Sequence, residues 1–121
     1  ANNCGTIVNG FVSEGVDLIM ANATAALTAA GAHMILFSTG RGTPFGAPAP
    51  TLKIATNSQL AAKKSTWIDF NAGVVADGEK TLDEAGADLY QLVLDVASGK
   101  QTCAEKKGFR EISIFKDGVV L

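Results

Sequence analysis

The chain has 121 residues, 47% of them hydrophobic, and its ten Lys and Arg against twelve Asp and Glu give a formal net charge of −2. This length suits one hydrophobic core, so we expect residues 1–121 to form a single domain. The basic residues are scattered except for Lys63-Lys64 and Lys106-Lys107. A protein that binds a phosphate backbone needs a patch of basic residues, so we do not expect nucleic acid as a partner.

The cysteines and the most apolar stretch exclude two further classes of protein. Cys4 and Cys103 are too few for a disulfide framework and too far apart for a zinc site. We expect free thiols in a reducing cytoplasm, with a Cys4–Cys103 disulfide as the alternative. Residues 15–37 contain Asp17, Asn22 and His33 and make a poor membrane span. The chain starts with Ala and has no signal sequence, so we expect a segment of a longer protein.

The first elements in chain order are a helix and a strand. Apolar residues at three- and four-residue spacing predict a helix over residues 16–30, with Ser13 as its N-cap and Gly31 as its stop. An alternative divides this segment into a strand over 16–20 and a helix over 23–30. The apolar run from His33 to Ser38 is typical of a strand covered on both faces, and we expect it to be the central strand.

The middle of the chain predicts two more strands. Residues 39–50 form a loop rich in Gly and Pro, and residues 51–56 alternate as a strand does. Thr56 and Gln59 have capping-box spacing, which predicts a short helix through Lys64. Residues 67–70 are a candidate third strand.

The last third of the chain contains the most regular element. Thr81 and Glu84 form a second capping box, and a helix with one apolar face follows it as far as residues 98–100. Residues 111–116 predict a strand, and Asp117-Gly118 a turn. Helices alternating with strands indicate an α/β fold, a single-domain layered sandwich with a mainly parallel, Rossmann-like sheet flanked by helices.

Polar residues follow each of the three predicted strands. They are Ser38, Thr39, Gly40, Arg41, Gly42 and Thr43 at the end of the first strand, Thr56, Asn57 and Ser58 after the second, and Asp69 and Asn71 at the third. Because the carboxyl ends of parallel strands meet at one edge, these residues define one candidate binding crevice.

The glycine-rich segment suits an anion. Its glycines allow close approach of backbone N–H groups, and Arg41 offers a planar fork for a carboxylate or phosphate. The alternative is that the glycines only form turns and Arg41 is solvated or salt-bridged. The spacing matches neither a P-loop nor a dinucleotide fingerprint.

The remaining candidates each have an ordinary alternative. Asp69 suits a general base, a metal ligand or an acceptor for substrate hydroxyls, and Asn71 suits hydroxyl binding; either can equally cap a turn. Lys53 is a candidate catalytic residue, but a solvated lysine is the favoured interpretation. His33 is expected to be structural. No cluster has metal-ligand spacing, so any catalytic metal would need ligands from outside this chain.

Several of these segments occur together in one known family. They are LFSTGRGTPFG at 36–46, PTLKIATN at 50–57, WIDFNAG at 67–73, VASGK at 96–100, GFREI at 108–112 and FKDG at 115–118. In this order they resemble the C-terminal part of the altronate/galactarate dehydratase family, over roughly residues 30–121. The resemblance implies that the chain is the C-terminal domain of a longer hydro-lyase and is inactive by itself.

The resemblance also implies a substrate, a cofactor and partners. The first expectation is D-altronate giving 2-dehydro-3-deoxy-D-gluconate and water, with galactarate dehydratase or a sulfolactate sulfo-lyase as alternatives. It implies a divalent metal, Fe2+ or Mn2+, with ligands outside this chain. It also implies contact with the remaining domains of the enzyme and allows a homo-oligomer. Arg41 and the loop N–H groups would hold the carboxylate, and Asp69, Asn71, Thr56 and Asn57 the polyol. A structural or oligomerisation domain without catalytic residues is the rival interpretation.

Overall fold

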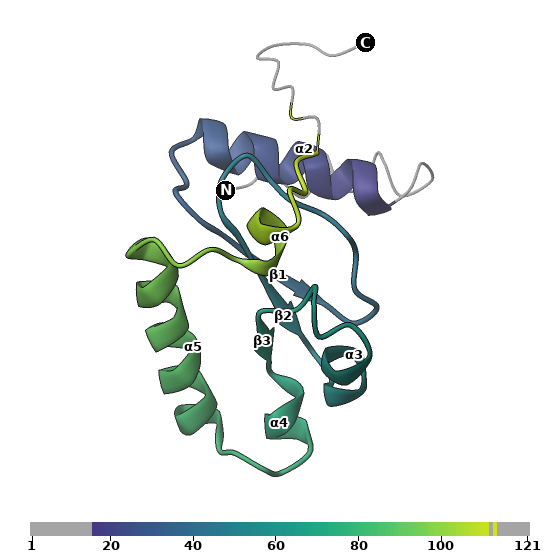
Figure 1. Cartoon of the computed structure of the whole chain (residues 1–121), viewed down its shortest axis with the longest axis vertical. Helices are drawn as coiled ribbons and strands as arrows, with labels where there is room; N and C mark the ends of the chain where they lie inside the picture. Colours follow the sequence, from purple (N-terminus) through teal and green to yellow (C-terminus); the bar gives the residue numbers. More distant parts are fainter. Residues whose placement is uncertain (1–15, 112, 114–121) are drawn as a thin grey trace.

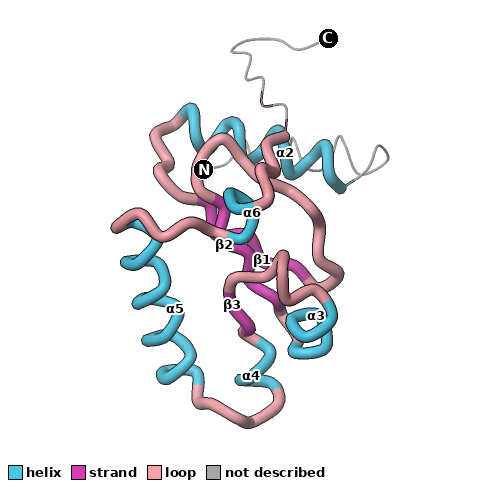
Figure 2. The backbone as a smooth tube through the Cα atoms, viewed as in Figure 1, coloured by secondary structure: helices cyan, strands magenta, loops and turns pink. Residues whose placement is uncertain are grey.

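The computed structural model describes residues 16–111 and 113. The elements are α2 (Val16–Ala29), β1 (Ile35–Thr39), β2 (Thr51–Ala55), α3 (Ser58–Lys63), β3 (Phe70–Asn71), α4 (Gly73–Ala76), α5 (Leu82–Ala97) and α6 (Cys103–Lys106). The three strands form one parallel sheet, with helices packed around it (Figures 1 and 2). The predicted α/β fold with a parallel sheet is confirmed. No described helix is long and apolar enough to span a membrane.

The strand order corrects the predicted position of the first strand. The order is β1-β2-β3, so β2 is central in the described sheet and β1 lies at its edge. Only alternate residues of β1 are buried, and Leu36 is 53% exposed. The apolar run of this strand therefore does not mean burial on both faces. Four of the five residues of β2 are buried, including Thr51 and Lys53.

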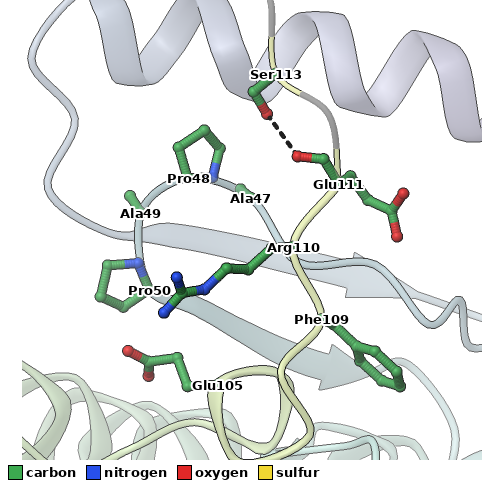
Figure 3. A pocket seen from close by; sticks show the side chains of 9 residues that line it. All are labelled: Ala47, Pro48, Ala49, Pro50, Glu105, Phe109, Arg110, Glu111 and Ser113. Atoms are coloured by element: carbon green, nitrogen blue, oxygen red, sulfur yellow. Dashed lines mark hydrogen bonds between the residues drawn. The ribbon is translucent and has the colours of Figure 1, made fainter.

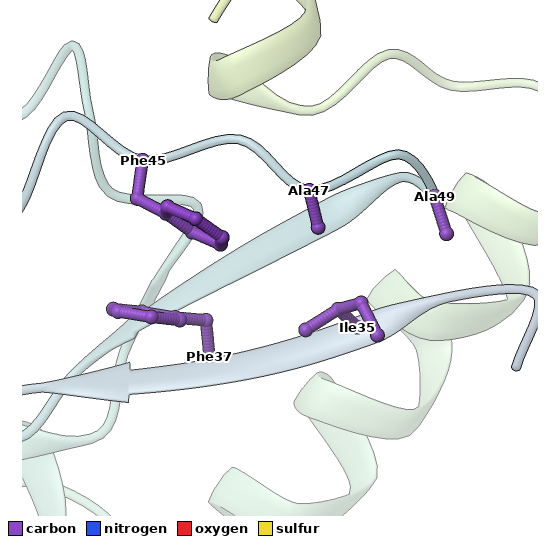
Figure 4. Close-up of a cluster of buried hydrophobic side chains, with 5 residues drawn as sticks. All are labelled: Ile35, Phe37, Phe45, Ala47 and Ala49. Atoms are coloured by element: carbon purple, nitrogen blue, oxygen red, sulfur yellow. The ribbon is translucent and has the colours of Figure 1, made fainter. Parts of the chain in front are cut away.

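An extended segment replaces a crossover helix between β1 and β2. Phe45, Ala47 and Ala49 occupy alternate positions and point onto β1, where they pack against Ile35 and Phe37 (Figure 4). The Phe37 and Phe45 rings stack with their centroids 5.5 Å apart. Parallel strands are usually joined by a helix. Prolines within this segment hold it extended, so that its apolar side chains can cover one face of β1.

The first half of the chain follows the predicted elements with one change of cap. Helix α2 is continuous, so the division into a strand and a shorter helix is wrong. Gly31 adopts a φ of 102° and ends the helix as predicted; Ser13 lies outside the described residues. The N-cap of α3 is Asn57 and not Thr56, because the Asn57 side chain accepts the Leu60 N–H at 2.8 Å.

The second half adds two short helices. The capping box of Thr81 and Glu84 starts α5 as predicted. A second box of Thr102 and Glu105 starts α6, which the sequence interpretation missed although its Thr-x-x-Glu spacing is visible. The third strand starts later and is shorter than predicted. The predicted strand over 111–116 and the Asp117-Gly118 turn lie largely outside the described residues.

Candidate functional site

The carboxyl ends of β1 and β2 lie side by side, as the sequence interpretation requires. The Thr56 N–H donates to the Thr39 carbonyl oxygen at 3.1 Å, and the Asn57 amide donates to the Gly40 carbonyl oxygen at 3.2 Å. Asn71 pairs with Ala55 at the end of β3. The structure thus brings the polar ends of all three strands to one edge of the sheet.

The chain after β1 forms a tight turn that presents Arg41. The Thr39 hydroxyl accepts the Gly42 N–H at 2.9 Å, which closes the turn. Gly42 has a φ of 76°, and a Cβ there would lie 2.9 Å from the side chains of Leu60 and Lys64. Glycine is therefore required at this position. Arg41 is exposed at the tip of the turn and forms no ion pair with any described residue.

Two lysines reach consecutive carbonyl groups of this turn. Lys64 Nζ donates to the Gly42 carbonyl oxygen at 2.9 Å and lies 4.7 Å from the centre of the Trp67 ring. Lys53 Nζ donates to the Thr43 carbonyl oxygen at 2.6 Å. Neither lysine has a carboxylate partner among the described residues. The turn therefore carries three cationic side chains, and the sequence interpretation missed Lys64 because its spacing gives no sign of this contact.

Lys53 is fully buried, with 0% exposure, so the interpretation of a solvated lysine is wrong. Its ammonium group lies 5.3 Å from the centre of the Phe109 ring. Burial lowers the pKa of Lys53 below its ordinary value of 10.5, and the nearby Asp69 opposes that change. The stem of Lys53 fills the core while its ammonium group holds the turn.

Stability should rise with pH because of Lys53. The folded protein binds this proton less tightly than the unfolded chain, so the penalty of burying the charge disappears as the pH rises toward 10.5. Relative to Lys53→Met, we expect the native chain to gain stability as the pH rises toward 10.5, by at most about 1.4 kcal/mol per pH unit. Urea unfolding at several pH values measures this. The exposed-site variant Lys63→Met should show no such trend, and a flat Lys53→Met difference would contradict the expectation.

Asp69 does not lie at the carboxyl edge of the sheet with the other polar residues. It precedes β3, and its two carboxylate oxygens accept the backbone N–H groups of Lys53 at 2.8 Å and Cys103 at 2.7 Å. Asp69 therefore ties the central strand to the first turn of α6. Burial, followed by the interaction with Asp69, raises the pKa of the Cys103 thiol, which is a free cysteine. Cys4 lies outside the described residues.

Asn71 belongs to a side-chain network with Ser58, which the sequence placed at the end of the second strand, and Asp77, which the sequence interpretation missed. Its carbonyl oxygen accepts the Gly73 N–H at 2.9 Å, and its amide donates to the Ser58 hydroxyl at 2.9 Å. The Ser58 hydroxyl in turn donates to the Asp77 carboxylate. These contacts join the end of β3 to α3 and α4, and they leave Ser58 and Asp77 beside the candidate crevice.

A cavity of about 520 Å3 lies near the amino ends of β1 and β2, away from the candidate crevice (Figure 3). Its lining includes Pro50, Glu105 and Arg110, and it contains none of the predicted site residues. His33 also lies before β1 and is exposed. Among residues 16–111 and 113, no three His, Cys, Asp or Glu side chains gather as metal ligands would. The metal implied by the resemblance does not fit this part of the protein.

Comparison with known proteins places the chain in a family. The family model described as D-galactarate/Altronate dehydratase, C-terminal, matches residues 8–120. Altronate dehydratase of Escherichia coli (strain K12) is 56% identical over 99 residues, which are 82% of this chain and 20% of that protein. Altronate dehydratase of Bacillus subtilis (strain 168) is 47% identical over 90% of this chain and 21% of its own length.

A more distant relative is the galactarate dehydratase (L-threo-forming) of Escherichia coli (strain K12). It is 41% identical over 76% of this chain and 18% of its own length. The chain thus spans about a fifth of the length of these curated relatives. On the family match and these identities, the chain belongs to the D-galactarate/altronate dehydratase C-terminal family.

Proposed function

We propose that this chain is the C-terminal domain of a sugar-acid dehydratase that converts D-altronate to 2-dehydro-3-deoxy-D-gluconate and water. The higher identity to altronate dehydratases, 56% and 47%, than to a galactarate dehydratase, 41%, supports altronate as the substrate. In this proposal the domain positions the substrate, and the rest of the enzyme completes the active site.

The observation that carries the proposal is the cationic turn after β1. Arg41 is exposed and unpaired among the described residues, and Lys53 and Lys64 reach the carbonyl groups directly behind it. This guanidinium group lies at the carboxyl end of a parallel strand and forms no ion pair with the described residues. It is therefore well placed to bind the carboxylate of a sugar acid. The adjoining Thr56 hydroxyl suits the polyol chain, and Asn57 and Asn71 each keep one amide hydrogen beyond their contacts within the fold to donate to it.

The reaction class explains why a cationic site is useful. Removal of the proton next to a carboxylate gives an enediolate, and cationic groups stabilise that charge before the β-hydroxyl group leaves. We assign this stabilisation to Arg41. Lys53 and Asp69 are engaged in contacts within the fold, so we assign them positioning roles and place the proton-abstracting base in the rest of the enzyme. The metal ligands belong there as well.

Replacing Arg41 in the full-length enzyme tests the proposal. Arg41→Ala should lower kcat/KM for altronate by about tenfold to a thousandfold, because a charged contact to the reacting carboxylate is lost. The melting temperature should stay the same, since Arg41 makes no ion pair with the described residues.

The matched control is Arg110→Ala, which removes an exposed arginine from the cavity of Figure 3. We expect this variant to keep its turnover. Full turnover in Arg41→Ala would contradict the proposal and favour the alternative, in which the domain supports or oligomerises the enzyme without binding substrate.

A further inference from the structure

Helix α5 has apolar residues on two sides, one that faces its own domain and one that is exposed. Ala85 and Val96 are buried on the inner side. Leu82, Tyr90 and Leu94 are 75%, 66% and 42% exposed. With Gly86, these three residues recur at four-residue intervals along one side of the helix. We call Leu82, Gly86, Tyr90 and Leu94 the outer line.

Nothing in the described part of the chain covers the outer line. Figure 1 shows α5 as the outermost element on its side of the molecule. A Cβ built on Gly86 would meet no atom within 4 Å. Single exposed apolar residues are ordinary, but three large apolar side chains gathered on one side of a stable helix are typical of an interface. The capping box of Thr81 and Glu84 fixes the first turn, so this face is formed in advance of any partner.

The charges of α5 indicate what kind of surface it meets. All the charged residues within Leu82–Ala97 are acidic, namely Asp83, Glu84, Asp88 and Asp95. Two lysines from outside the helix, Lys80 and Lys100, pair with Asp88 at 2.5 Å and with Asp95 at 3.4 Å. Asp83 and Glu84 form no ion pair with the described residues, although Lys80 lies near enough to Glu84 to interact with its charge. In a second copy, the flanking Lys80 and Lys100 are already paired with Asp88 and Asp95, so α5 offers no unpaired basic residue to Asp83, and self-pairing lacks charge complementarity.

We propose that the outer line of α5 packs against the part of the full-length polypeptide that lies outside these 121 residues. That surface has an apolar centre for Tyr90 and Leu94 and a Lys or Arg near Asp83. The inference rests on the proposed function, in which the chain is one domain of a longer dehydratase. The chain spans 20% and 21% of two curated relatives. The other part of their length, about four-fifths, is available to form this surface.

Thiol labelling of the full-length enzyme tests this packing. Tyr90→Cys and Leu94→Cys replace residues of the outer line, and Gln91→Cys replaces an exposed residue that lies on the polar side beside Asp95. The modification rate is followed by mass spectrometry of the α5 peptide. In the native enzyme we expect the two outer-line thiols to react at least about tenfold more slowly than Gln91→Cys. In guanidinium chloride all three should react equally.

Equal rates for all three variants in the native enzyme would overturn the proposal. Protection that disappears on dilution, together with a doubled mass, would overturn the choice of partner and assign the face to a second copy. The use of two outer-line variants keeps the test valid if one of them does not fold. Altronate turnover is measured separately, so failure of the dehydratase assignment is distinguishable from failure of this interface.

Discussion

Asp69→Asn is expected to lower the free energy of unfolding by about 3–5 kcal/mol, because each bond from the carboxylate to a backbone N–H contributes about 1.5–3 kcal/mol. Both oxygens of Asp69 accept such bonds, one from Lys53 and one from Cys103. An asparagine side chain has one oxygen and one NH2 group, so it can accept only one of these bonds and sets a donor against the other N–H. Urea unfolding followed by circular dichroism measures the loss.

The control for this prediction is Asp77→Asn, since Asp77 is exposed and, among the described residues, its carboxylate accepts only the Ser58 hydroxyl. We expect that substitution to change the stability by less than about 1 kcal/mol. A loss below about 1 kcal/mol in Asp69→Asn would mean that Asp69 does not hold β2 and α6 together.

The same variant separates a positioning role for Asp69 from a catalytic one. A general base contributes about 10²–10⁴ to the rate, so its removal would abolish most turnover even in fully folded enzyme. A positioning residue affects turnover mainly through the folded fraction. We therefore expect the kcat per folded molecule of full-length Asp69→Asn, measured well below its melting temperature, to fall by less than about tenfold.

The features that the sequence predicted are those that depend on neighbouring residues. The capping box at Thr81 and the apolar period of α2 and α5 act within one helix, and each is visible in the order of residues. The gathering of polar groups at Thr39, Thr56 and Asn71 also followed from the sequence, because parallel strands always align their carboxyl ends.

The features that the sequence missed depend on residues far apart in the chain. The edge position of β1 in the described sheet follows from its pairing with β2 alone, and the segment around Phe45 takes the place of a helix on one of its faces. The burial of Lys53 requires Phe109 above it and the Thr43 carbonyl group in front of it. Asp69 binds Cys103 across 34 residues. Local patterns contain no information about such contacts.

The candidate site shows the same difference between local signals, which the sequence contains, and long-range contacts, which it does not. Arg41 could be proposed as a site residue because a strand followed by Gly-Arg-Gly is a recognisable signal. Lys64 and Asp77 were missed, since their role depends on where α3 and α4 end relative to the turn. The nature of each group could be predicted from the sequence, whereas its partner could not.

Gly46→Ala is the second substitution with a large expected effect, a loss of about 3 kcal/mol or more in the free energy of unfolding. A Cβ at Gly46 would lie 2.0 Å from the carbonyl oxygen of Phe109 and 2.7 Å from its carbonyl carbon. Both atoms belong to the backbone, so no side-chain rotation relieves the overlap. The Glu111 N–H also donates to the Gly46 carbonyl oxygen at 3.0 Å, and this bond would be lost as the two segments separate.

The effect of Gly46→Ala should extend to Lys53, because Phe109 covers its ammonium group. If Phe109 moves away, water reaches Lys53, and the pH dependence of stability attributed to this lysine should become weaker. The control is Gly86→Ala on α5, where a Cβ meets nothing within 4 Å; alanine in a helix should raise stability by about 1 kcal/mol. Equal stabilities for Gly46→Ala and the native chain would show that the contact between Gly46 and Phe109 is not as close as described. A destabilised Gly46→Ala that keeps the native pH profile would instead show that Phe109 does not exclude water from Lys53.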